Sequence, residues 1–503
     1  MTPDKLSRRD FLRLASLGLV SLAARPRWAQ ALSPSSAPPQ VLTKAQRQRL
    51  VTASYRYLAP DDISATQMAI AIDFVEGPFE GASNMCGPLS VRILQDADLL
   101  GRWVSRNDFW LLNPRDNLDT LRETFPSELY HWFSYDSPFV DHDFSAQPLM
   151  AGDFIYLTAS PSDTFEHIFV VTRVDSEGRA YTVSNFLTAA GMVIEERLLY
   201  DPQEPGIGQV YDWADRSIRN TIGITGSGGY QIWRIKQASQ LEFPQEGPAR
   251  WLRDGLDALM LGSTAAWYAQ IEEIGGPLLF QFAPYSDFFP ASTIKLPIAL
   301  ATYAWLEEAA ASDWETFIRT QGAGGRSYQQ LLRAMLVESE EDATEILVEH
   351  LGAAALDARW QAWGLADTRV SPRRSSVRDL RACFLAASRG SWLKRSSQAH
   401  LLELLSAYTI NDEGRLGRLR KRVSVPLTIY NKRGSLVSGP MTVADSGIVV
   451  AGARRFFFTA SALGGAGSRY EDLEAELDRV VDLFGMYLAS SLYEARDNLH
   501  LPR

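Results

Sequence analysis

A serine and a lysine three residues apart open an apolar, helix-forming stretch at Ser292-Thr293-Ile294-Lys295. Residues with this spacing share one face of a helix, so the hydroxyl and the amine lie within one turn. A lysine whose pKa is lowered by burial or by positive neighbours can take the proton of a serine, and a helix N-terminus favours the negative charge that develops there. By itself the pattern also fits an ordinary helix start, so its meaning depends on the rest of the chain.

Two later segments accompany this pair. The first contains Ser339-Glu340-Glu341, and the second is Tyr430-Asn431-Lys432-Arg433-Gly434-Ser435. In order and register the three segments resemble the S-x-x-K, S-D-N and K-T-G elements of the class A β-lactamase and penicillin-binding protein superfamily. The resemblance covers roughly residues 250–500. It implies an α+β fold in which a transpeptidase-like sheet carries a helical subdomain.

The resemblance also implies roles for individual residues. Ser292 is the nucleophile and Lys295 its base, Ser339 relays a proton, and Lys432 supports it electrostatically. The backbone N–H groups of Ser292 and Ser435 form the oxyanion hole. The residues expected to bind substrate are Glu341, Arg433, Gly434 and Ser435.

Three departures from the family pattern affect this interpretation. Glu341 replaces an asparagine, so an amide donor is lost and a negative charge is placed near Lys295 and Lys432, which raises their pKa values. Arg433 replaces a hydroxyl residue, although a guanidinium can hold a substrate carboxylate by a bidentate pair. After Val370 the chain passes almost directly into a helix at residue 377, without the long loop whose glutamate activates the deacylating water. We therefore expect a β-lactam either to form an acyl-enzyme on Ser292 that persists or, if Glu341 prevents binding, not to acylate it at all.

The N-terminal half contains a second candidate site. Cys86 follows a Gly/Ser/Asn loop at the start of an apolar-periodic helix, a position that lowers the pKa of a thiol. His167 begins one expected strand, and Asn185 lies on the next. This order resembles papain-like cell-wall cysteine peptidases of the NlpC and CHAP types over roughly residues 60–235. The resemblance implies an α+β cysteine-peptidase fold in which Cys86 is the nucleophile, His167 its base and Asn185 the orienting group. The alternative is a buried structural cysteine and a histidine at a strand edge.

The first residues indicate export. Ser7-Arg8-Arg9-Asp10-Phe11-Leu12 closely matches a twin-arginine signal, followed by an apolar stretch and a small-residue cleavage site at Ala29-Gln30-Ala31. We find no other segment that would anchor the mature chain in a membrane. At 503 residues the chain is too long for one ordinary domain. We expect a signal peptide over residues 1–31, a disordered tether over 32–41 and a papain-like domain over 42–236. A linker over 237–249 then leads to a serine-hydrolase domain over 250–503.

Composition narrows the classes of partner. A net charge of −10 argues against a nucleic-acid binder. The histidines show no metal-ligand spacing, and we expect neither a metal nor a cofactor. We interpret the chain as an exported, periplasmic or extracytoplasmic bacterial cell-wall hydrolase that acts on amide bonds of peptidoglycan stem peptides, with a serine domain that binds such peptides or β-lactams. The alternatives are a class A-like β-lactamase with an accessory domain, and a serine domain that binds wall peptides without catalysis.

Overall fold

The computed structural model describes most of the chain beyond its first 39 residues. The described residues are 40–72, 82, 85–110, 112, 117–158, 165–189, 191–214, 228–238, 243–310, 313–407, 414–465 and 467–497. The expected signal peptide lies outside them, as do most of the tether and the loop that precedes Cys86. Within the described residues, no helix has the length and apolar character needed to cross a membrane.

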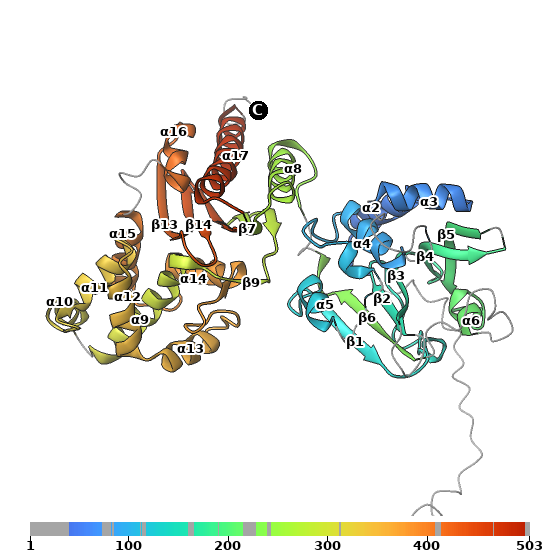
Figure 1. Cartoon of the computed structure of the whole chain (residues 1–503), viewed down its shortest axis with the longest axis horizontal. Coiled ribbons are helices and arrows are strands. Elements are labelled where there is room, and N and C mark those ends of the chain that lie inside the picture. Colours follow the sequence, from blue (N-terminus) through green and yellow to red (C-terminus); the bar gives the residue numbers. More distant parts are fainter. Residues whose placement is uncertain are drawn as a thin grey trace, which may run out of the picture.

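A six-stranded antiparallel sheet organises the N-terminal half, with strand order β1-β6-β2-β3-β4-β5 (Figure 1). Its strands are β1 (Tyr130–Tyr135), β2 (Phe154–Thr158), β3 (Phe165–Val174), β4 (Ala180–Thr188), β5 (Gly191–Tyr200) and β6 (Gly229–Ile235). Its helices are α2 (Lys44–Tyr55), α3 (Asp62–Ala71), α4 (Cys86–Asp96), α5 (Leu118–Thr124) and α6 (Gln209–Ala214), with short 3-10 turns η2 (Asn107–Phe109) and η3 (Phe139–Asp141). Both faces of the central strands of this sheet are buried. One face packs on the helices α2 and α4, and the other contributes a separate aromatic cluster that includes Phe169 and Trp213.

A five-stranded antiparallel sheet organises the C-terminal half, with strand order β13-β14-β15-β7-β8. Its strands are β7 (Ala266–Glu273), β8 (Leu278–Phe282), β13 (Leu427–Leu436), β14 (Thr442–Ala451) and β15 (Arg454–Leu463). The remaining short strands are β9 (Asp287–Phe288), β10 (Gly322–Ala323), β11 (Arg326–Ser327) and β12 (Ser375–Ser376). Two long strands, a mainly helical middle and three further long strands follow one another, the order of an α+β sandwich.

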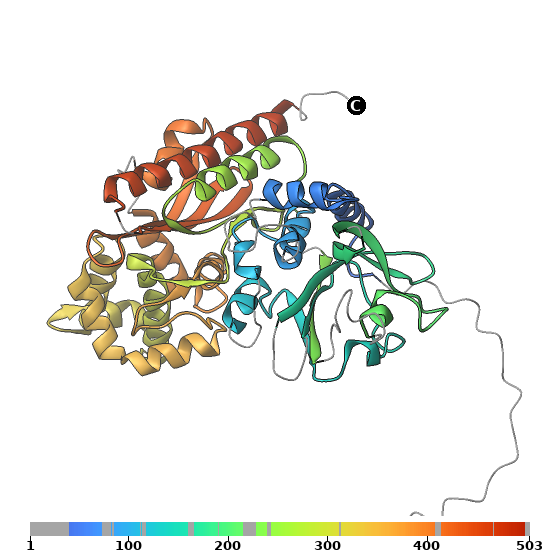
Figure 2. The same cartoon turned by 45° about the vertical axis from the view of Figure 1, so that its right-hand side comes forward.

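Helices cover both faces of this second sheet. The helices α8 (Gly247–Leu261) and α17 (Tyr470–Asp497) lie side by side over one face, in the layer at the top of Figure 2. A second cluster joins the other face to the helical part of this half. The helical part comprises η6 (Ala291–Ile294), α9 (Lys295–Ala309), α10 (Trp314–Thr320), α11 (Tyr328–Leu336), α12 (Glu341–Leu351), α13 (Ala353–Ala362), α14 (Val377–Arg389) and α15 (Arg395–Ala407). Before β13 come η7 (Arg415–Arg418) and α16 (Leu419–Arg422).

The two halves touch through polar and aromatic groups. Arg253 of α8 pairs with Asp98 at 2.9 Å, and Arg378 of α14 pairs with Glu128. The rings of Trp103 and Phe282 lie 5.9 Å apart. The contact of Glu128 with Arg378 places the segment between α5 and β1 of the first half against the start of α14 in the second.

Candidate functional site

Ser292 lies on a strained turn beside the sheet. It occupies η6, immediately before the helix α9, and its neighbour Ala291 has a φ of +45°. Non-glycine residues rarely adopt this left-handed backbone, and such strain concentrates at functional sites. The strand β13 packs against this turn at Gly434, where an added Cβ would meet the carbonyl oxygen of Pro290 at 3.0 Å and the Cβ of Ala291 at 3.1 Å. Gly434 therefore allows the strand that carries Ser435 to approach the turn that carries Ser292.

Two buried lysines converge on Ser339. Lys295 Nζ donates to the Ser339 carbonyl at 2.7 Å and lies 3.4 Å from its hydroxyl, while Lys432 Nζ donates to that hydroxyl at 2.9 Å. Ser339 itself has a φ of +57°, a second strained position in the same site. The structure thus brings together the three side chains expected to act with Ser292, which come from α9, from the segment before α12 and from β13.

Burial changes the chemistry of Lys432. Its removal from water, together with the charge of Lys295, lowers the pKa of Lys432 to about 7. An amine with this pKa is partly neutral at physiological pH and can accept a proton through the Ser339 hydroxyl.

Glu341 bridges Lys295 to an arginine that sequence reasoning did not single out. Its carboxylate lies 3.0 Å from Lys295 Nζ and also contacts Arg373, from the short connector that replaces the long family loop. Burial alone would raise the pKa of Glu341, but these two cations bring it below its usual value. Burial lowers the pKa of Lys295, Glu341 opposes that shift, and Arg373 adds to it. The expectation that Glu341 raises the pKa of Lys295 therefore describes one component of a balance whose net result is a lowered pKa.

The end of β13 is held by buried groups. The Arg415 guanidinium donates to the carbonyls of Gly434 and Ala444 at 3.0 and 2.9 Å, and to the Ser435 hydroxyl at 2.8 Å. In the sequence, only the position of Arg415 shortly before β13 pointed to this role.

Arg433, expected to bind a substrate carboxylate, instead donates to the Gly414 carbonyl, and its Nε lies 3.7 Å from the buried carboxylate of Asp445. Protein groups therefore engage the Arg433 guanidinium, an arrangement that does not support the expected contact with a substrate carboxylate.

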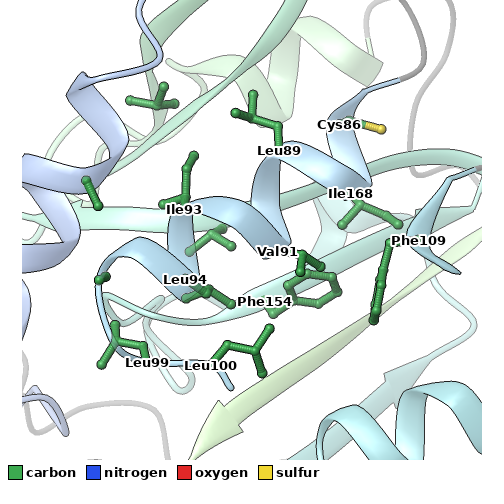
Figure 3. Packing of buried hydrophobic residues seen from close by; sticks show 14 of the residues in the cluster. Cys86, Leu89, Val91, Ile93, Leu94, Leu99, Leu100, Phe109, Phe154 and Ile168 are labelled. Atoms are coloured by element: carbon green, nitrogen blue, oxygen red, sulfur yellow. The ribbon is translucent and has the colours of Figure 1, made fainter. Parts of the chain in front are cut away.

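The three residues of the expected cysteine-peptidase site do not come together as the residues around Ser339 do. Cys86 begins α4 as predicted, and its buried side chain lies above Ile168 of β3, at the edge of the apolar cluster (Figure 3). Successive residues of a strand face opposite sides of a sheet. His167 accordingly lies on the other face of β3, where its ring packs near Phe169 and Trp213. The sheet therefore separates the expected nucleophile from its expected base.

The surroundings of these residues agree with that separation. Burial raises the pKa of the Cys86 thiol to about 11 and lowers that of His167 to about 4. His167 hydrogen-bonds the Ser184 hydroxyl at 3.2 Å, whereas Asn185 donates to the Ala82 carbonyl at 2.7 Å. Asn185 therefore does not orient His167. The helix N-terminus predicted a low thiol pKa, but desolvation outweighs it here.

Comparison with known proteins locates a family resemblance in the C-terminal half. Residues 256–476 match the model of the β-lactamase enzyme family named Beta-lactamase2. This region is β-lactamase-like, as its motifs predicted. No curated protein matches the chain.

Solved structures similar to this chain include PBP-A, with 20% identity and a TM-score of 0.40 over 51% of this chain and 100% of that one. A PBP-A variant in an acyl-enzyme complex with penicillin G gives the same identity and TM-score over 51% of this chain and 99% of that one. A class A β-lactamase from Bacteroides cellulosilyticus gives 12% identity and a TM-score of 0.40 over 49% of this chain and 100% of that one.

Proposed function

We propose that the C-terminal domain is an acyl-transferring serine enzyme that forms a covalent ester on Ser292 from β-lactams or from peptidoglycan stem peptides. The observation that carries this proposal is the Ser339 hydroxyl held between Lys295 and Lys432 beside the strained turn of Ser292. The family match of residues 256–476 supports the same class of chemistry, hydrolysis or transfer at an amide bond.

In the proposed reaction, Ser292 Oγ attacks the substrate carbonyl as neutral Lys295 takes the hydroxyl proton. The new C–O bond forms and the C–N bond breaks. The leaving nitrogen receives that same proton from Lys295 through the Ser339 hydroxyl, which lies 3.4 Å from Lys295 Nζ and can also exchange a proton with neutral Lys432. The backbone N–H groups of Ser292 and Ser435 stabilise the oxyanion, because Gly434 permits β13 to lie against the turn.

The proposal includes export by the twin-arginine route, because the first residues carry the arginine pair, the apolar stretch and the small-residue cleavage site in order. A periplasmic or extracytoplasmic location gives the domain access to cell-wall peptides. We do not extend the proposal to a cysteine peptidase, because Cys86 and His167 occupy opposite faces of the N-terminal sheet.

A non-catalytic binding domain is the second candidate. The ion pair of Glu341 with Lys295 favours it, because a nearby carboxylate stabilises the protonated lysine, which cannot act as a base. The two candidates differ in whether a covalent bond forms on Ser292.

Labelling of the exported protein with a fluorescent penicillin tests the proposal. We expect wild type to retain the label after denaturation, and Ser292→Ala to lose it. Ser388→Ala, which changes a partly buried serine on α14 away from the site, is the matched control and retains the label. Peptide mapping of the labelled chain to a residue other than Ser292 would refute the proposed nucleophile. Reversible binding without covalent label would establish the binding domain.

A further inference from the structure

The strand β1 has an open edge. It is the outermost strand of the N-terminal sheet, and no strand in the described part of the chain pairs with its outer side. The Leu129 carbonyl accepts from Lys236 N–H at 2.8 Å, and Tyr130 N–H donates to the Pro126 carbonyl. The alternation of an antiparallel ladder then directs the N–H and C=O groups of Trp132 and Ser134 outward. These groups can pair with one more extended chain.

A cleft of about 680 Å³ adjoins this edge, between the two halves of the protein. Its aromatic wall is formed by Trp132, which is 46% exposed, stacked on Trp233 with ring centroids 6.4 Å apart. Its other walls come from α5 and from Asp367 and Arg378 of the second half. A residue paired with Trp132 in an added strand would place its side chain on the same face as the indole, toward this cleft.

The carboxylates that line the cleft outnumber its cations by one, which favours a basic side chain in the ligand. They are Asp119, Glu123, Glu128 and Asp367, against Arg122, Lys236 and Arg378. Arg122 pairs with Asp119 at 3.7 Å, and Lys236 Nζ donates to the Ser127 carbonyl. Arg378 is neutralised by Glu128 and by Asp367, the latter at 3.0 Å. Glu123 has no ion-pair partner among the described residues that surround it. Glu123 is exposed on one side, and its partial desolvation together with the carboxylates of Asp287 and Asp119 raises its pKa, so a cation placed here would relieve repulsion. The neighbouring indole face also attracts cations.

We propose that β1 and the adjoining cleft form a binding site for an extended peptide that carries a basic side chain. The peptide backbone adds a strand to β1 at Trp132 and Ser134, and its lysine or related amine lies between the Trp132 indole and the Glu123 carboxylate. This site involves neither Ser292 nor Cys86, so it is independent of the acyl-transfer activity proposed above.

Fluorescence anisotropy with the full chain tests this site, using fluorescein-labelled Thr-Val-Lys-Val-Thr with a C-terminal amide. The first comparison peptide replaces the lysine with norleucine, and the second carries N-methyl groups on alternate amides. We expect saturable binding of the lysine peptide, weaker binding of the norleucine peptide and none of the methylated one. Trp132→Ala should weaken binding about tenfold, the order expected for a cation over an indole with its contact area. Trp251→Ala, which removes a similarly exposed tryptophan from α8, should leave binding unchanged.

A pair of substitutions at one position separates backbone from side-chain recognition. Ser134→Pro removes one outward N–H from an edge strand, where proline is tolerated, and should abolish binding. Ser134→Ala keeps that N–H and should bind as wild type does, and circular dichroism checks that both variants fold. Equal binding by Ser134→Pro and wild type would overturn the proposal, as would failure to saturate at about 1 mM peptide. Displacement of the peptide by chitotetraose in the Trp132 site would instead identify a glycan site.

Discussion

Lys432 Nζ lies 2.9 Å from the Ser339 hydroxyl, inside the protein and beside the turn that carries Ser292. A protonated lysine can only donate to that oxygen, whereas a neutral one can also accept its proton. Because the pKa of Lys432 is lowered to about 7, the direction of this hydrogen bond changes within the physiological pH range. The pair therefore links the acylation of Ser292 to pH.

We expect the rate of Ser292 acylation by penicillin to rise through about pH 7. Lys432 is mostly protonated below its pKa of about 7 and mostly neutral above it, so the relay operates on the alkaline side. Stopped-flow labelling across the pH range measures this profile. Ser339→Ala should lower the plateau by about a hundredfold, the scale of a lost proton-transfer group. A rate that is flat between pH 5 and pH 9, taken as rough limits around this pKa, would contradict the relay.

Glu341 and Arg373 should have opposite effects on acylation. Glu341→Gln removes the carboxylate that supports protonated Lys295, so the pKa of Lys295 falls and more of it is neutral. Loss of one close charge shifts a pKa by about one unit, which predicts an increase in labelling rate of about tenfold at neutral pH. Arg373→Gln removes a cation that lowers the pKa of Lys295, and so it should slow labelling.

Two neighbouring positions serve as controls for this pair. Glu345→Gln changes an exposed carboxylate one turn along α12, and Arg374→Gln changes the residue next to Arg373. Neither should move the labelling rate by more than about twofold, the effect of a distant surface charge. If Glu341→Gln and Arg373→Gln change the rate in the same direction, the electrostatic account of Lys295 is wrong.

Cys86 should react slowly with iodoacetamide in the folded protein. Only the thiolate reacts, and burial raises the pKa of Cys86 to about 11, so little thiolate is present at pH 8. Cys383 is also fully buried and should behave alike. Guanidinium chloride should expose both cysteines and accelerate their modification together. Mass spectrometry of the two peptides measures each rate, and rapid, selective labelling of native Cys86 would restore the cysteine-peptidase hypothesis.

The contrast between the two sites shows what the sequence could and could not predict. Ser292 and Lys295 share one helical turn, so their proximity follows from local geometry, whereas the position of Lys432 beside them was expected only from the family resemblance. The relation of Cys86 to His167 depends on which face of β3 each residue meets. The run Ile168-Phe169-Val170-Val171 is buried on both faces of β3, so the hydrophobic pattern of this strand does not indicate which face carries His167. The Arg373 contact with Glu341 joins a loop to a distant helix start, and no local pattern predicts it.

The acyl group on Ser292 should persist once formed. Hydrolysis needs a base that positions and deprotonates water, and the connector from Arg369 to Ser376 contains no carboxylate. The carboxylate that does lie at the site, Glu341, is held by Lys295 and Arg373, and its pKa is below its usual value, so it is a weak base. Intact-mass spectrometry after removal of excess penicillin should therefore show one stable adduct on wild type and none on Ser292→Ala. A chromogenic cephalosporin should give at most a single stoichiometric burst. Rapid multiple turnover that Ser292→Ala abolishes would instead establish a β-lactamase and would require a water-activating base other than the one the family loop supplies.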